Sequence, residues 1–162
     1  DAAFFVSGKL MNDPILLAAD LCRRSEGLRL CPYVCPAGYW TIGYGCRFLA
    51  NGAAVTASTA PITAEYAEGL LQATLARLLP QVLRLVRVPL TTGQQAALLD
   101  FTYNLGLPAL AASTLLKLLN AGQGNAARNQ LLLWNHMHRN GRLVTVAGLT
   151  ARRRAEWQLW AS

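Results

Sequence analysis

The first clear pattern of apolar and polar positions in the chain is that of an amphipathic helix. In the segment ILLAADLCRRS the apolar residues recur at helical spacing, so that they share one face. Asp13 is suited to cap this helix and Pro14 to occupy its first position, where proline is tolerated. Gly27 is placed to end the helix, which makes Glu26 its closing residue.

The pattern then changes to that of β-structure. From Leu28 to Tyr44 aromatic residues, Thr, Val and Ile stand on both sides of the turn sequence Pro36-Ala37-Gly38. Runs of this composition separated by a Pro/Gly turn predict a β-hairpin. We expect residues 47–62 to form a third short strand and a loop.

The rest of the chain is predicted to be helical, because apolar residues return to helical spacing between capping and stop residues. The expected helices are Thr63 to Pro80, Thr92 to Gly106, Ser113 to Gly122, residues 125–135, and a last helix capped by Thr150. The predicted fold class is α+β, in one domain over residues 1–162. A small hairpin lobe (about 27–62) accompanies a larger helical lobe (about 80–162 plus the first helix).

Composition supports a single folded domain. The 162 residues are 53% hydrophobic and 14% charged, which excludes a disordered or acidic linker protein. No apolar run approaches the roughly 18 residues of a membrane span. The start, DAAFFVSGKLMNDP, lacks the basic region and unbroken apolar stretch of a signal peptide. It also lacks an initiator Met, so a leader or signal anchor lost by processing stays possible and the export route stays open.

The net charge of +7 is concentrated at the C-terminal end. Residues 121–162 contain six Lys or Arg and one Asp or Glu. Such a segment indicates a polyanionic partner, which could be nucleic acid, an anionic lipid surface or an anionic cell-wall polymer. Nucleic acid ranks low among these, because no basic groove interleaved with aromatic residues is evident.

Four cysteines lie close together near the N-terminus. An even, clustered set permits disulfides and a non-cytosolic working place. A zinc site is disfavoured, because no C-x-x-C pair is present and the two histidines are distant. These histidines are expected at the surface near a loop. The residues concerned are Cys22, Cys31, Cys35, Cys46, His136 and His138.

Three residues with fixed spacing converge where the first helix meets the hairpin. Cys35 follows Glu26 by nine residues, and Thr41 follows Cys35 by six at the start of TIGYG. A carboxyl group at a helix end that faces a hairpin lies in a cleft wall, where partial desolvation favours its protonated form. A general acid that protonates a leaving oxygen near neutral pH needs such an environment.

The segment SEGLRLCPYVCPAGYWTIGYG, which contains these residues, resembles the active-site segment of phage lysozymes and endolysins, glycoside hydrolase family twenty-four. That family has a Glu followed by Gly, an Asp or Cys nine residues later, and a Thr six further on. QQAALLDFTYNLG with STLLKLLNAG resembles its helical-lobe signature, and GLTARRRAE resembles its G-L-x-x-R-R-x-x-E. The likeness covers roughly residues 15–160.

The resemblance implies a lysozyme-like fold with the active site in a cleft between the two lobes. It implies hydrolysis of the β-1,4 bond between N-acetylmuramic acid and N-acetylglucosamine in peptidoglycan, without metal or cofactor. Glu26 would be the general acid, Cys35 the second catalytic residue and Thr41 the residue that positions the hydrolytic water. The family is regarded as inverting, which suits two groups spaced widely enough to hold a water.

The resemblance also implies residues that line the substrate site. Arg153, or failing it Arg152, would pair with Glu26 from the last helix. One of the three consecutive arginines 152–154 is expected to turn into the cleft and two to meet solvent. Asn104 matches a cleft-lining amide, and Tyr33 and Tyr44 would flank the sugar.

Two residues depart from the family pattern. Cys35 replaces the usual carboxylate, and a thiol with a reference pKa near 8.5 is mostly protonated at neutral pH unless its surroundings help. Cys46 replaces a His thought to support the Glu. Cys31 and Cys35 would lie about 13 Å apart in a regular strand, too far for a disulfide. A disulfide between Cys35 and any other cysteine would nevertheless block the site and create a redox switch.

Three functions remain in competition. The first is an endolysin that lyses bacteria from the periplasm as a monomer, after synthesis in the infected host cell, with possible electrostatic contact with lipopolysaccharide or another anionic envelope component. The second is a lytic transglycosylase that uses Glu26 alone. The third is a peptidoglycan-binding protein whose catalysis is weakened.

Overall fold

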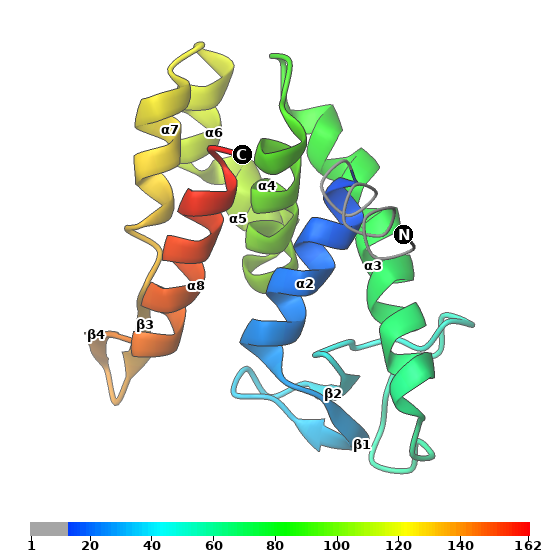
Figure 1. Ribbon diagram of the computed structural model, residues 1–162. Coiled ribbons are helices and arrows are strands. Elements are labelled where there is room, and N and C mark those ends of the chain that lie inside the picture. The colour runs from blue at the N-terminus through cyan, green and yellow to red at the C-terminus, as the bar shows by residue number, and fades with distance from the viewer. Residues whose placement is uncertain (1–12) are drawn as a thin grey trace, which may run out of the picture.

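Helix α4 (Thr92–Leu105) lies at the centre of the computed structural model, which describes residues 13–162. It contacts α2 (Pro14–Glu26), α3 (Ala64–Leu85), α5 (Leu107–Ala112) and α8 (Ala147–Leu159). Figure 1 shows these helices standing side by side, with two small hairpins at the same end of the bundle. The α+β class predicted from the sequence is confirmed.

The first helix and hairpin form as predicted. The Asp13 side chain accepts hydrogen bonds from the backbone amides of Ile15 and Leu16, and Gly27 ends α2 with a φ of 71°. Strands β1 (Arg29–Val34) and β2 (Trp40–Gly43) pair antiparallel around the predicted turn. The first helix therefore leads directly from Glu26 into the hairpin.

Residues 47–62 do not form the third strand that we expected. They contain a single isolated bridge, between Phe48 and Ala54, and otherwise make a loop that includes turns. A small core of four buried residues holds this loop to α3. Its members are Ile42, Cys46, Val55 and Leu70.

The expected stop of α3 at Pro80 is wrong, since the helix continues to Leu85. Proline removes one helical hydrogen bond and usually ends or kinks a helix. Here Val82 is fully buried, and Leu79 and Leu85 pack against the main core. This burial of apolar side chains outweighs the local cost of the proline.

The capping residues of two helices differ from the prediction. Thr91, not Thr92, caps α4, and it forms a capping box with Gln94. Thr150 lies inside α8, where its hydroxyl donates to the backbone oxygen of Val146, the residue that precedes the helix. Ser113 caps α6 (Thr114–Asn120) as predicted.

The segment after α6 holds the largest difference from the predicted elements. Helix α7 spans only Gly124–Leu131, and a second hairpin follows, formed by β3 (His136–Arg139) and β4 (Arg142–Thr145). Its turn, Asn140-Gly141, has positive φ at both residues, the signature of a tight hairpin turn. His136 and His138 are exposed as expected, although on a strand. The short helix α5 was also not predicted.

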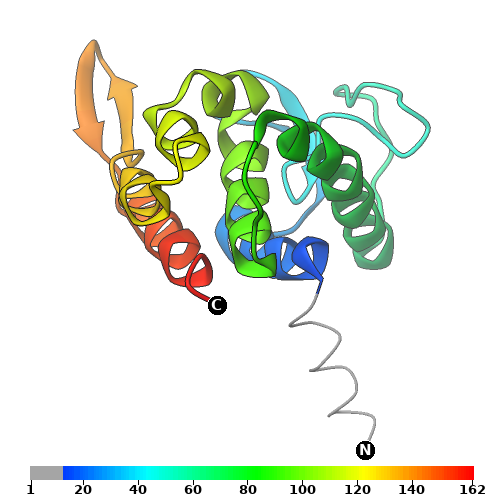
Figure 2. The ribbon, with the colours of Figure 1, turned by 90° about the horizontal axis from the view of Figure 1, so that it is seen from above.

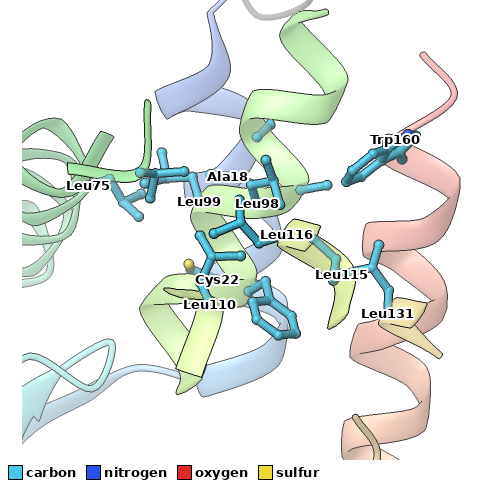
Figure 3. Close-up of a cluster of buried hydrophobic side chains, with 14 of the residues drawn as sticks. Ala18, Cys22, Leu75, Leu98, Leu99, Leu110, Leu115, Leu116, Leu131 and Trp160 are labelled. Atoms are coloured by element: carbon cyan, nitrogen blue, oxygen red, sulfur yellow. The ribbon is translucent and has the colours of Figure 1, made fainter. Parts of the chain in front are cut away.

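The main core lies between the helices, as Figure 3 shows for side chains of α2, α4 and α6 and for Trp160, which follows α8. Seen from above in Figure 2, the β3–β4 hairpin projects from the side of the molecule opposite the loop 47–62. No helix within residues 13–162 is long and apolar enough to cross a membrane.

Candidate active site

Glu26 stands at the junction of three elements. It is the last residue of α2, and its side chain keeps 24% of its surface exposed. From α8, the Nη1 of Arg152 donates to Glu26 Oε1 at 2.5 Å. Gly45, which follows β2, lies against the other oxygen, since a Cβ there would be 3.3 Å from Glu26 Oε2. One carboxylate oxygen is thus held by a cation and the other faces backbone.

The guanidinium of Arg152 also binds Asp100, at the centre of α4. Its Nε donates to Oδ2 and its Nη2 to Oδ1, both at 2.8 Å. The Cys22 thiol, from α2, donates to the same Oδ1 at 3.0 Å. This group of four side chains, Cys22, Glu26, Asp100 and Arg152, is called the buried ion cluster below.

Charge and burial set the protonation of this cluster. Burial works to raise the pKa of Asp100, but the hydrogen bonds and charge of Arg152 hold that pKa below its usual range. Burial, together with the charge of Asp100, raises the pKa of the Cys22 thiol well above its usual range. Asp100 is therefore an anion and Cys22 a neutral donor at neutral pH.

The prediction that Arg153 pairs with Glu26 is wrong, and the alternative, Arg152, is confirmed. Arg153 is fully buried and its Nη2 donates to Asn104 Oδ1 at 2.8 Å. The same nitrogen lies 2.8 Å from Glu156 Oε1 in an ion pair, although this oxygen accepts no hydrogen bond. Burial raises the pKa of Glu156, and the charge of Arg153 opposes this.

The expected exposure of the three arginines is also wrong, since Arg152 and Arg153 are both buried and only Arg154 is exposed. Neighbouring helical residues point about 100° apart, so both can face the bundle when each has a buried partner. Asn104, expected to line the substrate site, offers its amide oxygen to Arg153 instead of leaving it free.

The hairpin supplies Cys35 and Thr41. Cys35 comes directly after β1 and is half-buried, and its backbone amide donates to the Tyr39 oxygen at 2.9 Å. Thr41 is the cross-strand partner of Tyr33, is 3% exposed, and donates its hydroxyl proton to the Tyr33 carbonyl at 3.2 Å. The Arg29 guanidinium lies 4.6 Å from the centre of the Tyr33 ring.

Tyr44 and Cys46 are tied to α4 by a residue that the sequence reasoning missed. The Tyr103 hydroxyl donates to the Tyr44 backbone oxygen at 2.6 Å and lies 3.4 Å from the Cys46 sulfur. Cys46 is 4% exposed, and its other polar contact is Thr74. The family resemblance implied a residue at this position that supports Glu26. Cys46 instead joins the hairpin to α3 and α4.

All four cysteines lie within the described residues and are unpaired. Cys22 and Cys46 are buried, Cys35 is half-buried and Cys31 is exposed. Within residues 13–162, no three His, Cys, Asp or Glu side chains gather in a way that could hold a metal ion.

Asp100 is the main residue of the site that sequence reasoning did not single out. It is a lone carboxylate within the otherwise apolar run AALLDF. A charged residue on the buried face of a helix is rare unless it is paired. That signal pointed to a buried cationic partner, although not to which arginine.

Comparisons with known proteins agree with this architecture. The model of the phage lysozyme family matches residues 23–156. The chain is 38% identical to an endolysin of Acyrthosiphon pisum secondary endosymbiont phage 1, over 88% of this chain and 93% of that protein. It is 37% identical to the endolysin of Salmonella phage P22, over 86% of this chain and 92% of that protein.

Solved structures give the same result. An endolysin from the Escherichia coli O157:H7 phage FAHEc1 superposes with a TM-score of 0.78 at 35% identity, covering 89% of this chain and 90% of that one. The muramidase domain of SpmX from Asticaccaulis excentricus superposes with a TM-score of 0.78 at 32% identity, covering 90% of this chain and 95% of that one. A P22 lysozyme variant superposes with a TM-score of 0.73 at 34% identity, covering 90% of this chain and 95% of that one.

The fold and these matches define a glycosidase of the lysozyme type. The chain belongs to the phage lysozyme family. Its activity is that of an endolysin, the cleavage of peptidoglycan in the bacterial cell wall. The enzyme class and function predicted from the sequence are confirmed, whereas the roles of individual site residues stay predictions.

Proposed function

We propose that Glu26 is the general acid of this muramidase and protonates the glycosidic oxygen between N-acetylmuramic acid and N-acetylglucosamine. The observation that carries the proposal is the Arg152–Glu26 contact at 2.5 Å. It fixes one oxygen of a carboxyl group that is still 24% exposed. A fixed but accessible carboxyl group is what proton transfer to a bound substrate requires.

Thr41 positions the water that attacks the sugar. Its hydroxyl proton is already donated to the Tyr33 carbonyl, so its oxygen can only accept a hydrogen bond from that water. One water hydrogen then points to Thr41 and a lone pair is free for C1 of the sugar. Thr41 thereby sets the direction of attack.

Cys35 accepts the proton that the water releases. In this reaction the proton of Glu26 moves to the leaving oxygen as the C1–O bond breaks. The water oxygen bonds to C1 from the opposite face, and its proton passes to the sulfur of Cys35, which reacts in its thiolate form, the minor form of an ordinary thiol at neutral pH. Exchange with solvent then restores both groups. The anomeric configuration inverts, as the resemblance to the family implies.

The protein acts as a monomer on the cell wall from the bacterial periplasm, after synthesis in the infected host cell. Exposed cations of the C-terminal segment support contact with anionic envelope components such as lipopolysaccharide. Arg139 and Arg142 are exposed and lie directly opposite each other across the β3–β4 hairpin. Like charges in such a pair destabilise a hairpin, so an external anion would relieve their repulsion.

The roles at Glu26 and Cys35 are tested by rates of turbidity loss on permeabilised Gram-negative cells. Glu26→Gln keeps the shape of the side chain but cannot act as an acid near neutral pH, and should lose at least about 10²-fold in rate. The control is Glu68→Gln, which removes a carboxylate bound to Arg23 at 2.7 Å. It should keep the parental rate. A fully active Glu26→Gln would contradict the proposal.

A substitution series at position 35 tests the proton acceptor. Cys35→Asp restores a carboxylate that is ionised at neutral pH and should match or exceed the parental rate. Cys35→Ala has no acceptor and should lose about 10²-fold. If the alanine variant hydrolyses peptidoglycan at the parental rate, Cys35 has no part in the chemistry.

A further inference from the structure

We propose that Asp100 is a positioning residue for catalysis, which orients Arg152 and through it keeps the Glu26 carboxyl group aligned for its reaction. This inference rests on the proposed role of Glu26 as general acid. Asp100 itself is fully buried and has no path to the substrate. Its effect on the reaction therefore passes through the buried ion cluster.

The geometry of the cluster leaves Arg152 one orientation. Asp100 binds the Nε and Nη2 edge of the guanidinium through both of its oxygens. Such a two-point contact between a planar fork and a carboxylate fixes the plane of the guanidinium. The remaining nitrogen, Nη1, then points to Glu26. The Arg152 side chain is 4% exposed, so water has little access to compete for these contacts.

Cys22 ties the same carboxylate to the helix that carries Glu26. It precedes Glu26 by four residues on α2, so the two side chains lie on one helix face. Its thiol and Arg152 Nη2 both donate to Asp100 Oδ1. The last turn of α2, the centre of α4 and α8 are thus joined at one buried carboxylate.

Charge sharing gives Asp100 a second effect. The single positive charge of Arg152 lies between two carboxylates. Because Asp100 is ionised, its negative charge offsets the positive charge of Arg152. Loss of the Glu26 proton then leaves the cluster with a net negative charge in a buried setting. Without Asp100, Arg152 would attract the ionised form of Glu26 alone. Removal of the Asp100 charge should therefore change the pH dependence of the reaction.

The other titratable groups around Glu26 do not supply this charge. Burial raises the pKa values of Cys46 and of Tyr103, which keeps them neutral. Cys22 is neutral for the same reason. Arg153, the next cation on α8, has Glu156 beside it. Asp100 is the anion in direct contact with Arg152 besides Glu26 itself.

The test is the pH–activity profile of Asp100→Asn on peptidoglycan, with kcat and KM determined separately. Asparagine keeps the size of the side chain and removes the charge. The alkaline limb of the profile should move to lower pH by about one unit, the size of a single neighbouring charge. At neutral pH kcat should fall about tenfold, with KM within about twofold. A packing role alone would not move the profile.

The matched control is Glu68→Gln, which makes the same change in net charge at an Arg–carboxylate pair between α2 and α3. Its profile should coincide with the parental one. A second variant, Arg152→Lys, keeps the positive charge at the position but replaces the fork by one nitrogen. Since one ammonium group cannot reproduce three fixed contacts, kcat should again fall about tenfold. This variant decides the question if Asp100→Asn does not fold.

Either of two results overturns the inference: a folded Asp100→Asn with the parental profile, or Arg152→Lys with the parental rate and profile. If these occur while Glu26→Gln is inactive, the proposed function stands and only the inference fails. If Glu26→Gln keeps the parental rate, the proposed function fails, and the inference fails with it.

Discussion

At the scale of single residues, the site depends on how closely Glu26 is enclosed. Arg152 holds one of its oxygens, and Gly45 brings backbone against the other. Gly45 also has a φ of 85°, which residues with a side chain rarely adopt. Two reasons therefore favour glycine at position 45, the last residue of TIGYG: the positive φ, which is conformational, and the lack of space for a Cβ beside Glu26, which is steric.

Gly45→Ala separates these two reasons when it is compared with Gly52→Ala. Both positions have nearly the same φ, 85° and 84°, but a Cβ at Gly52 meets nothing within 4 Å. Both variants should lose about 1–2 kcal/mol of stability from the strained backbone. Only Gly45→Ala should also lose activity, by about 10²-fold, because a displaced catalytic group is costly. Rates on peptidoglycan and thermal unfolding curves measure the two effects, and equal activities in the two variants would refute the steric reason.

The sequence indicated candidate catalytic residues at this scale but not all of their partners. The spacing of Glu26, Cys35 and Thr41 was visible along one continuous segment. The choice between Arg152 and Arg153 was not, because it depends on how α8 is rotated against α4. Asp100 and Arg152 are 52 residues apart, and only the packing of two helices brings them together.

At the scale of elements, local signals predicted the helices whose ends are capped by side chains. Asp13, Thr63 and Ser113 cap their helices as expected. Predictions failed where tertiary packing decides, as at Pro80 within α3. They also failed for the β3–β4 hairpin, although the Asn140-Gly141 turn signal was present, because short strands with exposed side chains have little apolar alternation.

Packing of α4 against the C-terminal end can be tested with two glycines. A Cβ at Gly93, in the first turn of α4, would overlap the backbone oxygen of Leu159 at the end of α8. Gly93→Ala should therefore destabilise the protein by about 1–3 kcal/mol. Gly69 lies inside α3 with open space around it, so Gly69→Ala should stabilise by about 0.5–1 kcal/mol. Urea unfolding gives both values, and a change of the same sign in both variants would contradict this account of α4.

At the scale of the whole molecule, the structure refines the meaning of the +7 charge. Of the six arginines in residues 121–162, Arg152 and Arg153 are buried beside carboxylates. The exposed cations of this segment are Arg139, Arg142 and Arg154. Within this segment, the exposed charge therefore lies on the β3–β4 hairpin, at Arg139 and Arg142, and on α8, at Arg154.

Removal of this charge should weaken binding to the envelope. The double variant Arg139→Gln/Arg142→Gln should bind isolated envelopes several-fold less tightly than the parent at low salt, and its binding should depend less on salt. The control, Arg84→Gln/Arg87→Gln, removes the same charge from exposed positions at the end of α3. Co-sedimentation at a series of salt concentrations provides the measurement. Equal losses in the two double variants would show that net charge, not the hairpin, attracts the envelope.

The most direct test of the central claim, hydrolysis with Glu26 as general acid, is mass spectrometry of muropeptides released in heavy-oxygen water. The parent should give new reducing ends that each carry one heavy oxygen, because water attacks C1 of the sugar. Glu26→Gln should release almost none. The account would be contradicted by 1,6-anhydro ends without heavy oxygen, which a transglycosylase makes, or by labelled ends from Glu26→Gln at the parental rate.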